Sequence, residues 1–188
     1  MPDMSVGRAA LAGILGWAAL AAAGCGSKGS NPDLPPAPAT MRLGSPAFAD
    51  GGTMPTRFTC SGPGQEPPLR WRGVPRGTQE LALVMTDPDA PGGGFVHWTA
   101  YALSPHARAA VAPLPADALE GTNDFGDRAY GPPCPPPGDD PHHYVFRLYA
   151  LGKPSGLAAG ASPDAVATAI DRAGPLAQAT LTGRFGRD

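Results

Sequence analysis

Positive charge is scarce in this sequence, and lysine occurs only as Lys28 and Lys153. The 188 residues include 14 lysines and arginines and 16 acidic residues, so that charged residues make up 16% of the chain and the net charge is −2. No stretch gathers the positive charge that a nucleic-acid-binding surface needs. We therefore expect no nucleic acid among the partners.

Short motifs of metal and hydrolase chemistry are missing as well. The three cysteines and four histidines form no Cys-x-x-Cys or His-x-x-x-His pair, which are spacings typical of metal sites. No Gly-x-Ser-x-Gly elbow is present, and nothing marks Ser61 as a nucleophile. We expect no metal, no cofactor and no enzymatic activity. A metal site built from scattered Asp, His and Cys, or a simple esterase activity, is a minor alternative.

The long apolar run, residues 9–24, carries no charge and follows Arg8. A membrane-spanning helix needs about 20 apolar residues, so this shorter run fits a signal peptide better. It ends in small residues before Cys25, as in lipoprotein signal peptides, although Ala22 stands where leucine is usual. We expect a lipoprotein signal peptide over residues 1–24, with an ordinary secretory peptide as the alternative.

The residues around the cleavage site predict where the protein resides. Cys25 is expected to carry acyl chains, palmitate among them, and two or more chains anchor a protein stably. Gly26 is no acidic retention signal, which favours the outer membrane, facing the periplasm. Residues 25–40 are rich in Gly, Ser and Pro and have almost no apolar bulk, which predicts a tether, flexible and then polyproline-like. The folded domain is expected over residues 41–188.

Most of this domain is expected to be β-structure. Residues 81–85 are a short apolar run closed by Asp-Pro, as in a buried strand. Residues 97–103 and 143–151 alternate in polarity, and residues 181–185 fit a last strand. The 26 glycines and 25 prolines of the sequence fall largely at turns between these runs. The pattern predicts an antiparallel, sandwich-like β fold.

One helix is expected near the C-terminus, on the periphery of the sheets. Ser162 can cap its first turn, Pro163 suits its first position, and Asp164 favours its amino end. Gly174 and Pro175 should end or kink it.

Polar residues gather at the expected strand ends. Asp87 and Asp89 lie one residue apart between prolines, and His97 begins the next strand. A third group extends over residues 121–144 and includes a proline-rich loop. Because proline donates no sheet hydrogen bond, such a loop can wall a pocket but not enter a sheet.

The order of these segments resembles the phosphatidylethanolamine-binding protein (PEBP) family, in its bacterial branch similar to Raf kinase inhibitor protein. The resemblance covers residues 41–188. It rests on the strings Phe-Thr-Cys-Ser-Gly (58–62), Pro-Leu-Arg-Trp (68–71), Asp-Pro-Asp-Ala-Pro (87–91), His-Trp (97–98), Gly-Thr-Asn-Asp-Phe-Gly (121–126), Gly-Pro-Pro-Cys-Pro-Pro (131–136) and His-His-Tyr (142–144).

The resemblance implies a PEBP-like β fold with a shallow pocket for phosphate-like anions or phospholipid head groups. It places the following residues at the pocket, in its supporting loop or in its wall: Asp87, His97, His142, Tyr144, Asp89, Cys134, Pro135 and Pro136. Pro132 departs from the family, which usually has glycine there, and proline fixes the backbone angle and removes an N–H.

Simpler roles are open for several of these residues. Asp87 and Asp89 can serve only to organise a turn, as Asx residues often do, and His97 can be structural. Strand alternation turns His143 away from the pocket, and His106 is expected to be exposed.

Two functions follow from the resemblance. The first is binding of a small anion or head group, and the alternative is a protein-interaction module that inhibits a kinase or peptidase. Histidines can supply positive charge when they are protonated. Since Asp87 lies nearby, we expect them to hold protons readily, and binding to strengthen as the pH falls through about 6.5.

A disulfide between Cys60 and Cys134 is also expected. Lipidation takes Cys25 and leaves two cysteines, both in segments of the resemblance, in an oxidising compartment. Two separate thiols are the alternative.

Overall fold

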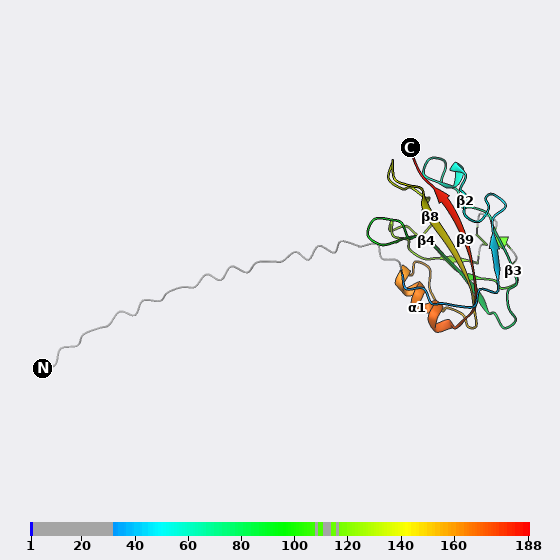
Figure 1. The fold of residues 1–188 in the computed structure, drawn as a ribbon. Helices are drawn as coiled ribbons and strands as arrows, with labels where there is room; N and C mark the ends of the chain where they lie inside the picture. The colour runs from blue at the N-terminus through cyan, green and yellow to red at the C-terminus, as the bar shows by residue number, and fades with distance from the viewer. Residues whose placement is uncertain (2–31, 108, 111–113, 116) are drawn as a thin grey trace.

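The computed structural model describes residues 32–188, apart from residues 108, 111–113 and 116, together with Met1. The predicted signal peptide and Cys25 lie outside the described residues. Within the described ranges, no helix has both the length and the apolar character needed to cross a membrane. Figure 1 shows strands packed into two sheets, with one α-helix at the side.

Nine strands, one short 3₁₀ helix and one α-helix make up the described part of the chain. Their bounds are β1 Arg42–Gly44, β2 Gly52–Thr53, η1 Thr56–Phe58, β3 Leu69–Arg72, β4 Glu80–Asp87, β5 Phe95–Leu103, β6 Ala109–Ala110, β7 Leu119–Glu120, β8 His142–Leu151, α1 Pro163–Ala173 and β9 Pro175–Phe185.

The strands form two sheets. The smaller sheet has the order β1-β3-β6, and the larger has the order β2-β9-β8-β4-β5-β7. All pairs are antiparallel except β2 with β9, which is parallel over two residues. The predicted strands are confirmed as parts of β4, β5, β8 and β9, but β9 begins at Pro175 rather than at residue 181. The sequence therefore predicted the fold class correctly.

Two apolar cores lie on the two faces of the larger sheet. The core between the sheets contains Leu83, Met85 and Phe146, and the core beneath α1 contains Ala82 and Val84. Strand β4 thus buries both of its faces, which explains why its sequence is continuously apolar rather than alternating.

Helix α1 follows the predicted signals. The Ser162 Oγ accepts a hydrogen bond from the Ala165 N–H at 3.3 Å, and Pro163 begins the helix. Gly174 ends it at φ 68°, in the left-handed region that glycine adopts without strain. Val166 and Ile170 then face the sheet.

The segment over residues 32–40 is part of the domain, which corrects the expected tether. The Tyr149 hydroxyl donates to the Pro35 carbonyl at 3.0 Å, and the Gln178 N–H donates to the Pro38 carbonyl at 2.9 Å. Leu34 packs against the core beneath α1. Apolar contact and hydrogen bonding therefore hold a segment whose proline-rich composition suggested a free linker, and the domain begins before residue 41.

Candidate functional site

The predicted site lies at one end of the larger sheet, where the ends of four strands meet. Strand β4 ends at Asp87, opposite Phe95 at the start of β5. Strand β8 begins at His142, opposite Phe185 at the end of β9. Figure 1 marks this end by the C-terminus, which follows β9 directly. Strand ends on a rigid sheet can display polar groups in fixed positions.

A β-bulge aims His97 into this site. Met85 pairs with Trp98, but the next residue, Thr86, pairs with Val96, so β5 holds one residue more than β4 at this point. Such an extra residue breaks the alternation of faces and re-aims a side chain. The His97 ring consequently contacts the Tyr144 ring edge to face, with 5.2 Å between centroids.

Asp87 joins the two histidines of the site. Its Oδ2 accepts a hydrogen bond from the His142 Nδ1 at 2.8 Å and lies 4.0 Å from the His97 Nε2. Its Oδ1 accepts from the Asp89 N–H at 2.9 Å, which is the turn-forming role that the sequence left open. Asp87 therefore does both: it organises the turn and orients a histidine.

Hydrogen bonding fixes one nitrogen of each imidazole. The His97 Nδ1 lies 2.9 Å from the Gly131 carbonyl, which only accepts, so this nitrogen carries the proton. The His142 Nδ1 likewise donates to the Asp87 carboxylate. The Nε2 atom of each ring therefore donates a hydrogen bond to a ligand only when the ring is protonated.

Burial corrects the expected protonation of His97. The side chain is only 4% exposed. This burial lowers the pKa of His97 below 6.5, and the Gly131 carbonyl and the Asp87 carboxylate, which raise the pKa, offset it only in part. The expectation that this ring holds its proton more readily beside Asp87 is thus wrong for His97: burial outweighs the carboxylate and favours the neutral ring.

Tyr144 lies between the two histidines with its hydroxyl unused. The residue is fully buried, and its Oη has no hydrogen-bond partner in the described part of the chain. Burial, followed by the negative charge of the Asp87 carboxylate and the approach of the hydroxyl to it, raises the pKa of Tyr144 far above its usual value, although the two groups do not meet in hydrogen-bond geometry. The hydroxyl therefore keeps its proton and remains a donor at every physiological pH.

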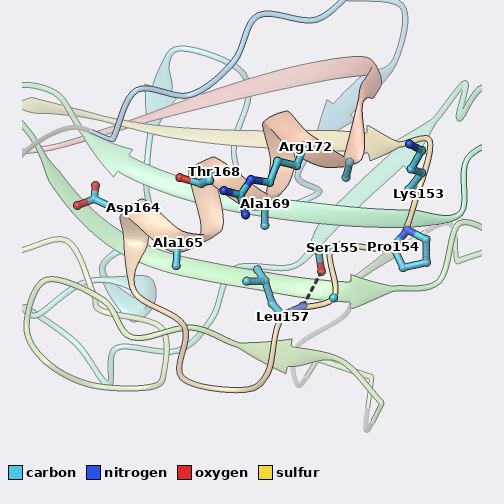
Figure 2. A pocket seen from close by; sticks show the side chains of 11 residues that line it. Lys153, Pro154, Ser155, Leu157, Asp164, Ala165, Thr168, Ala169 and Arg172 are labelled. Carbon is cyan, nitrogen blue, oxygen red and sulfur yellow. Dashed lines mark hydrogen bonds between the residues drawn. The ribbon is translucent and has the colours of Figure 1, made fainter.

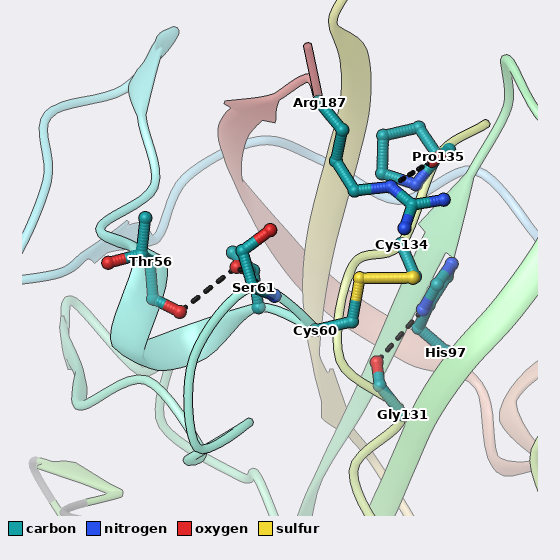
Figure 3. Close-up of a disulfide and its surroundings, with 9 residues drawn as sticks. Thr56, Cys60, Ser61, His97, Gly131, Cys134, Pro135 and Arg187 are labelled. Atoms are coloured by element: carbon teal, nitrogen blue, oxygen red, sulfur yellow. Dashed lines mark hydrogen bonds between the residues drawn. A yellow bond between two sulfur atoms is a disulfide. The ribbon is translucent and has the colours of Figure 1, made fainter. Parts of the chain in front are cut away.

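The predicted disulfide closes this end of the domain. Cys60 and Cys134 are bonded, with 5.3 Å between their Cα atoms (Figure 3). The bond ties the chain just after η1 to the loop over residues 131–138, and the Cys60 N–H donates to the Pro133 carbonyl at 3.0 Å. This loop carries the Gly131 carbonyl that holds His97.

The residues predicted to form the pocket wall differ in their burial. Pro135 is buried, whereas Cys134 and Pro136 are exposed. Pro132, the departure from the family pattern, is half-buried, and its Cγ lies 3.2 Å from the position that a Cβ on Gly64 would occupy. It packs against the neighbouring loop at Gly64.

Sequence reasoning missed the arginine of this site. The Arg187 Nε donates to the Pro135 carbonyl at 2.6 Å, and Figure 3 shows its side chain reaching over the disulfide-bonded loop. Its positive charge lowers the pKa of Tyr144, against the effect of Asp87. No motif surrounds Arg187, and its place two residues after the last strand was the one available signal.

Asp89 and His143 lie outside this cluster. The Asp89 Oδ2 accepts from the His143 backbone N–H at 2.7 Å and contacts its Nδ1 at 2.8 Å, and both side chains are exposed. Partial burial raises the pKa of Asp89, but these bonds outweigh it and lower the pKa overall. His143 is thus held by Asp89 apart from the Asp87 cluster, although it borders the hollow in front of His142, and His106 is exposed, as predicted.

A polar hollow opens in front of His142. Its lining is acidic, and the Asp139 Oδ2 lies 3.8 Å from the His142 Nε2. The residues around it are Asp89, Gly138, Asp139, Asp140, Pro141, His142, His143 and Arg184. In the described ranges, no three His, Cys, Asp or Glu side chains converge as metal ligands would.

A second hollow, of about 490 Å³, lies away from these residues, between α1 and the loop over residues 153–157 (Figure 2). Leu157 and the small side chains Ala165 and Ala169 line it, with Lys153 and Arg172 toward the carboxyl end of the helix. None of the predicted site residues lines it.

Comparison with known proteins agrees with the resemblance. Residues 44–186 match the family model described as phosphatidylethanolamine-binding protein. The "Putative lipoprotein LppC" of Mycobacterium tuberculosis is 42% identical over 153 residues, which cover 80% of this chain and 75% of that protein.

Two crystal structures share the fold. One is a PEBP homologue from Chlamydia trachomatis, with a TM-score of 0.73 and 35% identity over 79% of this chain and 99% of that one. The other is YbcL of Escherichia coli, also with a TM-score of 0.73 and 32% identity over 80% of this chain and 100% of that one. The chain therefore belongs to the phosphatidylethanolamine-binding protein family.

Proposed function

We propose that this domain binds a small phosphate-like anion, free or as a phospholipid head group, and does so without chemical turnover. The unpartnered Tyr144 hydroxyl carries the proposal. Leaving a buried donor without a partner costs about 1–3 kcal/mol, and a ligand oxygen at this position removes that cost. The site holds no free thiol, because Cys134 is disulfide-bonded.

The groups around Tyr144 suit an anion. Arg187 supplies a permanent positive charge, and the Nε2 of His97 becomes a donor on protonation, whereas the Nε2 of His142 faces Asp139 in the acidic hollow. Charge-assisted hydrogen bonds are the stronger kind. The Asp87 carboxylate already accepts two hydrogen bonds, so it positions the donors rather than meeting the ligand.

The acidic hollow beside His142 supports a head group that also carries an ammonium. Asp139 and Asp140 line this hollow and are exposed. They repel a second anion and attract a cation. Phosphoethanolamine should therefore bind more tightly than inorganic phosphate.

Binding of an anion should strengthen as the pH falls. Sulfate is the suitable probe, because its own charge stays constant over this range. The pKa of free His97 lies below 6.5, so binding sulfate to the protonated ring requires uptake of a proton at any higher pH. Affinity should rise as the pH falls from 8 to 6.5, by up to about tenfold for each pH unit, which is the limit for uptake of one proton. Calorimetric titration of the domain at several pH values measures this slope.

The matched variant is His97→Asn, whose amide can still donate to the Gly131 carbonyl but offers no group that titrates. Its slope should be clearly shallower, while a His106→Asn control, altered at an exposed histidine, should behave like the wild type. Sulfate affinity that does not change with pH, or that changes equally in both variants, contradicts the proposal.

We further propose that the domain is anchored in the cell envelope through lipidated Cys25, on the outer membrane facing the periplasm. The lipoprotein name of the mycobacterial relative supports this anchor. A Cys25→Ala protein should move from the membrane fraction to the soluble fraction, because two or more acyl chains supply nearly all of the membrane affinity. Fractionation of cells that express each form tests it, and a variant that stays with the membranes contradicts it.

A further inference from the structure

Aromatic side chains border the site and take no part in the proposed binding of the anion. Phe125 is 50% exposed and, with Leu176 at 41%, is one of two exposed large apolar side chains among the described residues of the domain. A single exposed apolar residue is ordinary on a protein surface. Phe125 is distinguished by how firmly it is held and by its position beside His97.

Hydrogen bonds fix the loop that carries Phe125. The buried Asn123 side chain accepts from the N–H groups of Phe125 and Asp127 at 3.0 and 2.9 Å. The Asp124 Oδ2 accepts from the Val96 N–H and ties the loop to strand β5. The loop therefore presents an apolar ring to solvent in one fixed position, which pre-organises it for contact.

Three rings pack together at this border of the site. The Phe125 ring meets Phe95 with 4.6 Å between centroids and His97 with 5.4 Å, in both cases edge to face. A Cβ on Gly131 would lie only 2.6 Å from the Phe125 ring, so this ring rests directly on the loop that holds His97. We call Phe95 and Phe125 the aromatic shelf.

The shelf and the acidic hollow lie on different sides of the site. The shelf adjoins His97, whereas the hollow opens in front of His142, and the Asp87 carboxylate lies between the two imidazoles. A ligand oxygen near Tyr144 therefore has a polar, acidic side and an apolar, aromatic side.

From this arrangement, and resting on the proposed anion site, we infer that the preferred ligand carries an aromatic group next to its anion, and that Phe125 recognises this group. A flat ring can pack against the exposed face of Phe125 while its phosphate meets Tyr144 and Arg187. Aromatic pairs contribute beyond the burial of their area, so an aryl ester should bind more tightly than an alkyl ester of similar size.

The test compares phosphate monoesters by calorimetric titration of the domain at one pH. Phenyl phosphate should bind about fivefold to tenfold more tightly than glycerol phosphate, with butyl phosphate between them. In Phe125→Ala the ratio of phenyl phosphate to glycerol phosphate affinity should fall to about one. The control Leu176→Ala alters the other exposed apolar residue, at the far end of β9, and should keep the wild-type ratio.

The outcomes separate this inference from the anion site. If glycerol phosphate binds but phenyl phosphate binds no more tightly, or if Phe125→Ala keeps the ratio, Phe125 recognises no ligand group and the inference is wrong. Equal affinities for phenyl and butyl phosphate overturn recognition of a ring. If no ester binds and inorganic phosphate does not bind either, the proposed anion site itself fails.

Discussion

Replacing both bridged cysteines, in a Cys60→Ser, Cys134→Ser protein, should lower the free energy of unfolding by up to about 4 kcal/mol. The bond joins residues 74 positions apart, and the chain-entropy model gives that value for a loop of this length. Urea denaturation of the domain measures the loss. As a control, a reductant should destabilise the wild type to a similar extent and leave the double variant unchanged.

The same variant should also bind sulfate less tightly. The disulfide holds the loop whose carbonyls position two groups of the site, at Gly131 for His97 and at Pro135 for Arg187. Loss of the bond frees this loop, so part of the binding energy must then go into ordering it. Unchanged stability and unchanged affinity in the double variant would show that the bridge braces neither the fold nor the site.

Tyr144→Phe should weaken sulfate binding by about tenfold to a hundredfold, because a hydrogen bond to a charged group contributes about 1.5–3 kcal/mol. Among the described residues, the same buried hydroxyl has no hydrogen-bond partner. Its removal therefore costs no native hydrogen bond and should raise the free energy of unfolding by about 1 kcal/mol. Weaker sulfate binding combined with higher stability is the result expected if the Tyr144 hydroxyl serves ligand binding rather than folding.

Tyr149→Phe is the matched control at the other end of strand β8. Its hydroxyl donates to the Pro35 carbonyl of the N-terminal segment, so its loss should reduce stability and leave sulfate affinity unchanged. Calorimetric titration and urea denaturation of both variants give the comparison. Equal sulfate affinities in Tyr144→Phe and the wild type contradict the assigned role of Tyr144.

Local sequence signals were sufficient for the main elements of the fold. The strand over residues 143–151 and the helix after Ser162 follow from alternation and capping, which depend on neighbours in the sequence. The ordered motifs of the family brought Asp87, His97, His142 and Tyr144 together as candidates, and the structure places all four at one end of the sheet.

The sequence pattern does not predict features that depend on tertiary contacts. The bulge that aims His97 depends on the pairing of β5 with β4, and the lowered pKa of His97 depends on its burial. The proline-rich composition around Pro35 predicts a linker, because composition does not show which hydrogen bonds the proline carbonyls accept. Arg187 reaches the site only because the fold brings its chain end beside the loop at Pro135.

The most direct test of the anion site is a crystal structure of the domain soaked in sulfate at pH 5.5. We predict density for the anion within hydrogen-bond distance of the Tyr144 Oη and close to the Arg187 guanidinium. An anion bound only elsewhere, for example beside Lys153 and Arg172 in the hollow at α1, with the Tyr144 hydroxyl still unpartnered, would contradict the account.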